Sequence, residues 1–173
     1  EKYLTESVTN PAAEIKALDA FSVFGLLSPD LLKRTKEWKE ASPGRVPPVL
    51  AAAKIHSALG WNARGGKYAR DTEERQLQAM REYFVYAEAA LRRVIEMAPN
   101  CMVAHDLMLS IANARLPESE QDRLIEETVQ LFPASYAIHL RHMWMKLPRW
   151  GGSYRAMEEL ARGWQERAPA EFK

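Results

Sequence analysis

The most regular hydrophobic pattern of the chain lies between residues 71 and 98. Apolar side chains recur there every three or four residues: Leu77, Met80, Phe84, Ala87, Leu91, Val94 and Ile95. This spacing predicts an amphipathic helix with one face against a core. Asp71 and Glu74 have the spacing of a capping box, so we expect the helix to begin at residue 71 or 72.

Shorter apolar stripes, separated by Pro and Gly, predict helices on both sides of this segment. We expect them over 11–27, 29–41, 49–60, 101–114, 117–131, 135–146 and 154–164. The expected core positions of the first two are Ile15, Leu18, Phe21, Phe24, Leu31, Leu32, Thr35 and Trp38. Residues 61–66 are expected to form a corner. Because alternating strand patterns are missing, the predicted fold class is all-α, with antiparallel pairs of about seven helices and an N-terminal helical extension over 1–29.

Composition and charge narrow the class of protein. The 173 residues are 47% hydrophobic and 27% charged, which is typical of a folded chain, and we expect a single helical domain over 1–173. Lys and Arg total 24 against 23 Asp and Glu, so a net charge of +1 gives no field that would hold nucleic acid. Residues 101–133 are mainly acidic and 134–173 mainly basic, so a binding face of either sign is compatible with the sequence.

The single cysteine and the absence of a long apolar run bear on the compartment. Cys101 cannot form an intrachain disulfide, which favours a reducing environment, and we expect the cytoplasm. No run of about 18 apolar residues predicts a membrane span. Because the chain does not begin with Met, a removed leader stays open as an alternative.

Two helix ends repeat at a fixed interval. Pro99 and Pro133 are 34 residues apart, and apolar residues precede each of them at the same offsets. This interval is that of a tetratricopeptide repeat, in which helix pairs stack and the first helix of each pair lines a concave surface. We therefore expect degenerate repeats over 87–169, with 101–114 and 135–146 on the concave side. The consensus Trp, Gly and Tyr positions are not matched, so a plain helical bundle is the alternative.

Three segments together resemble an uncharacterised bacterial family, a domain of unknown function with tetratricopeptide-like helices. They are Trp61-x-Ala63-Arg64-Gly65, the stretch from Ala87 to Pro99, and Leu147-Pro148-Arg149-Trp150-Gly151-Gly152-Ser153, the last being the most specific. The resemblance covers about residues 30–164. It implies a helical fold and a bacterial origin, and it assigns no reaction, substrate or catalytic residue.

Histidines give the one candidate for metal chemistry. His139 and His142 are three residues apart on an expected helix, and His105 lies 34 residues before His139, so stacked repeats could bring the three together. Catalytic zinc commonly has three protein ligands, and Cys101 or Asp106 could complete a fourfold set. The close pairs of Cys or His typical of zinc sites are missing, and packing of the rings in the core is the alternative.

Other chemical motifs are weaker. Cys101 at a helix start, with His105 one turn later, has the spacing of an activated thiol, but buried structural cysteine is the ordinary interpretation. The Gly-rich segments 65–67 and 151–153 lack the spacing of phosphate-binding loops. We expect both to be helix ends at which Gly adopts a left-handed conformation.

Two corners combine a large ring with a guanidinium. Trp61 lies near Arg64, and Trp150 follows Arg149. In each corner the pair either locks the turn by stacking or binds a partner, and an acidic peptide or an anion is the partner expected if the guanidiniums line a pocket. We retain as candidate binding residues Trp61, Arg64, His105, His139, Arg149 and Trp150.

Three functions follow from these features. The first is a non-catalytic helical-repeat module that binds a protein or peptide without a cofactor, such as an adaptor or an immunity-type inhibitor. The second is a metal-dependent helical enzyme that uses His105, His139 and His142. The third is a scaffold segment of a longer chain. The sequence predicts neither the partner nor the oligomeric state.

Overall fold

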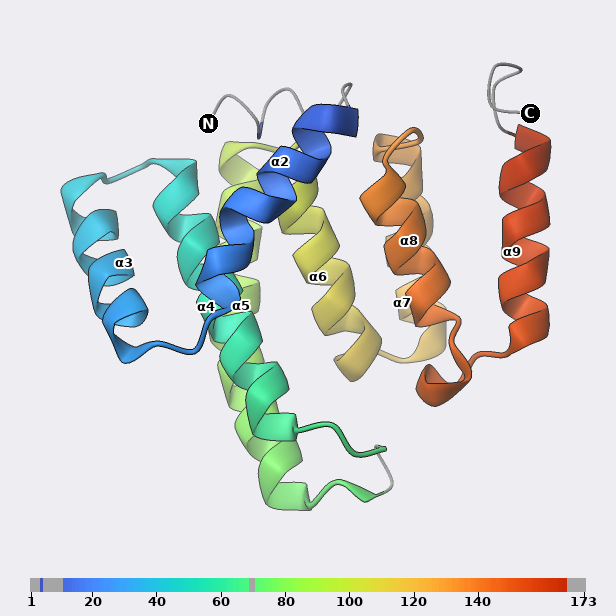
Figure 1. Cartoon of the computed structure of the whole chain (residues 1–173), viewed down its shortest axis with the longest axis horizontal. Coiled ribbons are helices and arrows are strands. Elements are labelled where there is room, and N and C mark those ends of the chain that lie inside the picture. Colours follow the sequence, from blue (N-terminus) through green and yellow to red (C-terminus); the bar gives the residue numbers. More distant parts are fainter. Residues whose placement is uncertain (1–3, 5–10, 69–70, 168–173) are drawn as a thin grey trace.

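The computed structural model describes Leu4 and residues 11–68 and 71–167, and over this part the protein is all-α, as predicted (Figure 1). The described residues contain no strand. Over these residues the helical elements follow one another in this order: α2 (Pro11–Ser22), η1 (Val23–Gly25), α3 (Pro29–Ala41), α4 (Val46–Arg64), α5 (Glu74–Met97), α6 (Met102–Arg115), α7 (Glu118–Leu131), α8 (Tyr136–Met145), η3 (Pro148–Trp150) and α9 (Tyr154–Arg167).

The helices form two layers with one helix across them. In Figure 1, α4, α6 and α8 lie side by side toward the viewer, while α5 and α7 lie behind them and α2 crosses in front. Adjacent helices along the chain from α4 to α8 contact one another, and so do α4 with α6 and α6 with α8. We call the side formed by α4, α6 and α8 the inner face. The first helix of each expected pair therefore lies on one side of the molecule.

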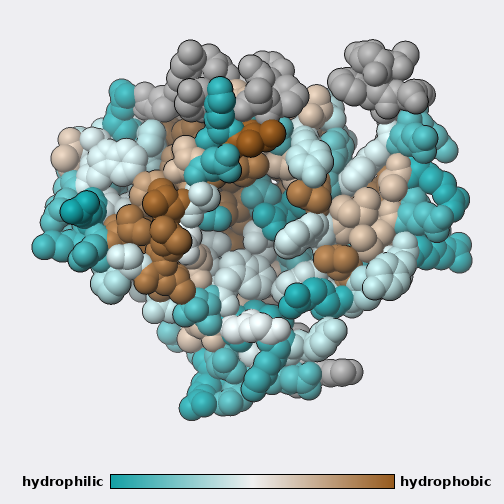
Figure 2. Space-filling model, viewed as in Figure 1, coloured by the Kyte–Doolittle hydropathy of each residue, from teal (hydrophilic) through white to brown (hydrophobic). Residues whose placement is uncertain are grey.

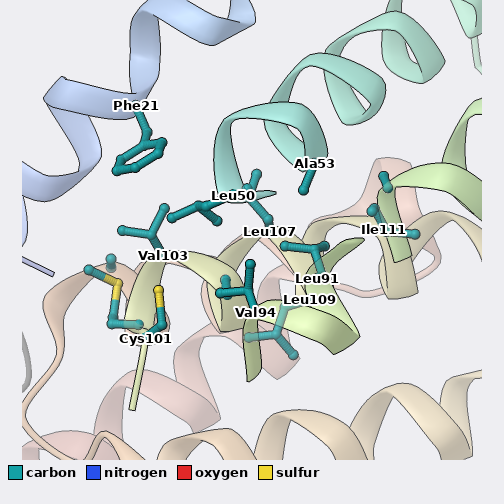
Figure 3. Packing of buried hydrophobic residues seen from close by; sticks show 14 of the residues in the cluster. Phe21, Leu50, Ala53, Leu91, Val94, Cys101, Val103, Leu107, Leu109 and Ile111 are labelled. Atoms are coloured by element: carbon teal, nitrogen blue, oxygen red, sulfur yellow. The ribbon is translucent and has the colours of Figure 1, made fainter. Parts of the chain in front are cut away.

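The core lies where α2, α4, α5 and α6 converge, and Figure 3 shows Phe21, Leu50, Leu91 and Val103 meeting there. Three of the core positions expected for the first two helices are wrong. Ile15, Leu32 and Trp38 are all exposed, Ile15 to 57%. The buried face of α2 instead runs through positions 13, 14, 17 and 21, and Ile15 lies outside it.

The contact between α4 and α5 is the most extensive of the fold. Gly60 lies against the ring of fully buried Phe84, and a Cβ atom at Gly60 would lie 2.5 Å from Phe84 Cε1. The predicted end of this helix is wrong, because α4 continues through residues 61–64. The predicted cap of α5 is wrong as well: Glu73 and Gln76 form the capping box, and Asp71 and Glu74 do not.

The turns before α6 and α8 are built alike. His105 Nε2 lies 2.8 Å from the carbonyl oxygen of Pro99, and His139 Nε2 lies 2.8 Å from that of Pro133. Because a carbonyl oxygen can only accept, each ring donates from Nε2. The same hydrogen bond thus recurs after 34 residues and agrees with the predicted repeat. Superhelical stacking itself stays a prediction.

The N-terminal extension is tied to the far end of the inner face. Glu14 on α2 is buried, and Glu14 Oε1 accepts hydrogen bonds from Ser135 Oγ, at 3.0 Å, and from the backbone N–H of Ala137. Ser135 in turn caps α8 by accepting from the N–H of Ile138 at 3.2 Å. The carboxylate lies at the positive end of the α8 dipole, which compensates its burial. The predicted helix over 11–27 ends at Ser22 and continues as η1.

We expect Gly60→Ala to destabilise the fold although Ala favours helices. The added methyl would clash with Phe84 and lie 3.3 Å from the carbonyl oxygen of Met80, and overpacking of this kind costs about 1–3 kcal/mol. Thermal unfolding measures the loss. Gly66→Ala is the matched control, because nothing lies within 4 Å of its Cβ position. A Gly60→Ala protein as stable as this control would contradict the close packing.

Glu14→Ala should lower the free energy of unfolding by about 1–3 kcal/mol, because it leaves a buried backbone donor at the start of α8 without its partner. Urea unfolding gives the value. Asp19→Ala on the exposed side of the same helix serves as control, and its loss should be small. Equal losses in the two variants would show that the Glu14 hydrogen bonds contribute nothing.

Candidate functional site

The turn between α8 and α9 sets the position of Trp150. Gly151 has a φ of +96°, and a Cβ atom at Gly152 would lie 2.1 Å from the carbonyl oxygen of Lys146. The N–H of Gly152 donates to the carbonyl of Leu147 at 3.2 Å. The chain therefore folds back tightly onto the end of α8, which only glycines permit. Gly65, after α4, also has a positive φ, so both Gly-rich segments follow the ends of helical segments, as expected.

The two aromatic corners, far apart in the sequence, meet in space. The rings of Trp61 and Trp150 pack edge to face with centroids 5.7 Å apart. Arg64 Cζ lies 5.1 Å from the Trp150 ring centroid, and Arg149 Cζ lies 5.2 Å from it. We call these four residues the Trp–Arg cluster. Its members come from the last turn of α4 and from η3, so the cluster joins opposite ends of the inner face.

The two guanidiniums of this cluster differ in their surroundings. Arg64 is only 4% exposed, and its Nη1 donates to the carbonyls of Gly65 and Lys67, each at 3.1 Å. This is the structural role expected of a residue that locks a helix end. Arg149 is exposed. Burial lowers the pKa of Arg64, and the positive charge of Arg149 lowers it further, so the two cations repel each other.

A pocket of about 250 Å³ opens on the inner face beside this cluster. Helices α4, α6 and α8 and the η3 turn line it with Trp61, Ser110, Asn113, Arg141, Trp144, Met145 and Trp150. Trp144 is 53% exposed, so its ring is accessible to a partner. Asn113 Oδ1 is buried and accepts no hydrogen bond from the described residues. Three indole rings thus surround a largely apolar space.

A partly buried ion pair fixes Arg141 beside the pocket. Arg141 Nε donates to Asp106 Oδ1 at 2.7 Å and Arg141 Nη2 to Asp106 Oδ2 at 3.0 Å, which is the bidentate geometry of a strong pair. Asp106 is 7% exposed. Lys54 lies in the same environment: burial lowers its pKa, Asp106 opposes this effect and Arg141 adds to it. The pair joins α6 to α8 and orients the guanidinium.

The histidines do not form a metal site. Among the residues that the structure describes, no three His, Cys, Asp or Glu side chains are grouped so that they could hold a metal ion. His105 packs against Phe132, whereas the rings of His139 and His142 pack against Trp164. Together with their bonds to proline carbonyls, these contacts make His105 and His139 braces of the turns, not members of the Trp–Arg cluster.

Cys101 has the environment of a structural thiol. It is buried at the start of α6, and burial raises its pKa, although hydrogen bonds from the N–H groups of Ala104 and Val103 act in the opposite direction. The thiol is thus protonated near neutral pH, whereas a nucleophilic cysteine is a thiolate. The structural interpretation of Cys101 is favoured.

A second apolar surface lies apart from the pocket. Figure 2 shows brown, hydrophobic atoms gathered beside α3, over the segment that follows α2. Val23, Leu26 and Leu27 are exposed there, Leu26 to 62%. The sequence analysis placed none of these three residues in a site.

Comparisons with known protein families, with curated proteins and with solved structures give no match. The resemblance of the Trp–Arg segments to a bacterial family therefore stays a prediction. In the described part of the chain, no helix combines the length and the apolar character that crossing a membrane requires.

Sequence reasoning found the four residues of the Trp–Arg cluster but missed the other residues that line the pocket beside it. Trp144 was not among the candidate binding residues, because it lies in an aromatic and Met-rich segment, a pattern more typical of a core. One signal was present: Asp106 and Arg141 are 35 residues apart, close to the repeat interval. Opposite charges at nearly equivalent positions of successive inner helices could have indicated their pairing.

The stability of the protein should decrease as the pH falls below about 6.5. Burial lowers the pKa of His105 and of His56 from the ordinary value of 6.5, and Lys39 adds to the effect on His56. The histidines of the unfolded chain then bind protons more readily than those of the folded protein. Their contribution to stability is therefore fully present above pH 6.5 and is lost as the pH falls toward the lowered pKa values of the folded state. Urea unfolding between about pH 7.5 and 5 tests the expectation.

The variants His105→Gln and His56→Gln separate the two contributions. Each should make the pH dependence shallower, and the double variant should make it shallower still. An unchanged slope in the double variant would mean that neither ring is responsible.

Proposed function

We propose that the chain is a non-catalytic helical-repeat module of a bacterial protein, which binds a protein or peptide segment on its inner face. The observation that carries the proposal is the pocket between three helices of that face, with the exposed Trp144 ring beside it. Trp and Arg side chains dominate the energetics of protein interfaces, and here they gather in one place. The two equivalent turns at Pro99 and Pro133 support the repeat architecture that the proposal assumes.

The rigid surroundings of the pocket suit recognition. Trp61 is held between Phe84 and Trp150 by edge-to-face contacts with centroids 5.4 and 5.7 Å apart, and Arg141 is held by Asp106. Side chains that are already ordered lose little conformational entropy when a partner binds. An adaptor and an immunity-type inhibitor would both use such a surface. No described group of side chains favours the metal-dependent enzyme.

Selection from a library of random peptides displayed on phage tests this function. Peptides enriched on the protein should bind it in solution, and Trp144→Ala should weaken them at least about tenfold, as truncation of an interface Trp does. Trp38→Ala on α3 is the matched control, because that ring is also partly exposed but lies outside the pocket lining. Circular dichroism verifies that both variants are folded.

Two results would contradict the proposal. One is that no peptide is enriched over an unrelated folded protein. The other is that the enriched peptides bind wild-type protein and the Trp144→Ala variant equally well.

A further inference from the structure

The size and the lining of the pocket limit what it can hold. Its volume of about 250 Å³ is below the range of about 300–1,000 Å³ that small-molecule and cofactor sites occupy. The side chains of Trp61, Trp144, Trp150 and Met145 provide most of its lining residues. A space of this size and character suits one large apolar side chain of a partner, because aromatic and sulfur-containing surfaces pack well against such a group.

The charged residues around the pocket indicate which groups of a partner would flank that side chain. The surroundings contain the guanidiniums of Arg64, Arg141 and Arg149, and the carboxylate of Asp106 pairs with Arg141. The nearby Lys146 is paired with Asp122 at 2.7 Å. Among the described residues, Arg64 and Arg149 have no carboxylate partner, so the site carries an excess of positive charge.

The excess of positive charge disfavours quaternary ammonium groups as ligands of this pocket. Cages of Trp and Tyr commonly bind quaternary ammonium groups through cation–π attraction. Here two guanidiniums already lie against the Trp150 ring, and a third cation would be repelled by both. An anionic group beside the pocket would instead relieve the repulsion between Arg64 and Arg149 and pair with the exposed Arg149.

We propose that the pocket binds an acidic peptide segment, in which one aromatic side chain enters between Trp61, Trp144 and Trp150 and flanking carboxylates pair with Arg149 at the rim. The inference rests on the proposed function and adds the chemical class of the partner.

Three synthetic peptides of equal length test it. The first has a central Trp between Asp residues, the second has Lys in place of every Asp, and the third has Ala in place of Trp. NMR titration of ¹⁵N-labelled protein follows the indole N–H signals, which the Trp61→Phe, Trp144→Phe and Trp150→Phe variants assign. We expect the first peptide to shift these signals and to bind at least tenfold more tightly than the other two, and added salt to weaken it.

A charge reversal provides the sharper comparison. Arg149→Glu should reduce the affinity for the Asp peptide at least tenfold and raise that for the Lys peptide. Arg92→Glu makes the same change on the exposed side of α5, away from the pocket, and should leave both affinities within about twofold of wild type.

The outcomes separate the two proposals. If the Lys peptide shifts the same indole signals as strongly, the acidic partner is wrong and the peptide-binding function stands. If none of the three peptides shifts these signals while peptides selected from the random library do, the partner class is wrong again. If the library also gives no binder that depends on Trp144, the function itself fails.

Discussion

The close approach of α4 to α5 at Gly60 is the constraint from which the site is built. Because Gly60 has no side chain, the Phe84 ring lies where a Cβ atom would otherwise be. Phe84 then supports Trp61, the next residue of α4, and Trp61 supports Trp150 across the inner face. The wall of the pocket is thus an extension of the helix contact in the core, and its rings are ordered by packing before any partner arrives.

The pocket also depends on polar contacts between inner helices. The pair of Asp106 and Arg141 joins α6 to α8, and breaking a buried pair by removing one partner leaves an uncompensated charge. The pair therefore acts as a specific spacer between two helices, which apolar side chains alone would not provide. Arg149 is exposed and forms no ion pair with the described residues, so its charge is available at the surface.

Much of the fold was predictable because its local signals are strong. The stripe from Leu77 to Ile95 identified α5 and its buried face, and the prolines at positions 99 and 133 marked the turns before α6 and α8. The ends of helices were less certain, because Trp61 to Arg64 continue α4 for reasons of packing against Phe84 and Trp150 that no local pattern records.

The site was half predictable for a related reason. The sequence indicated the four residues of the Trp–Arg cluster, because each large ring lies close to an Arg in a segment expected to form a turn. Their meeting in one cluster depends on contacts between α4 and η3, and the exposure of Trp144 depends on which neighbours surround α8. Neither property is encoded in a short window of sequence. The burial of Glu14 is a similar case, since its partner lies on a helix near the other end of the chain.

The hydrogen bonds of Glu14 change how the chain is expected to fold. Its hydrogen bond to Ser135 spans 121 positions of the chain, whereas units of an open repeat array contact only their neighbours and can order independently. A contact of such range forms late, after the intervening segments have been placed, and slows folding. By tying α2 to the start of α8, this single carboxylate favours cooperative loss of the structure between them over gradual fraying.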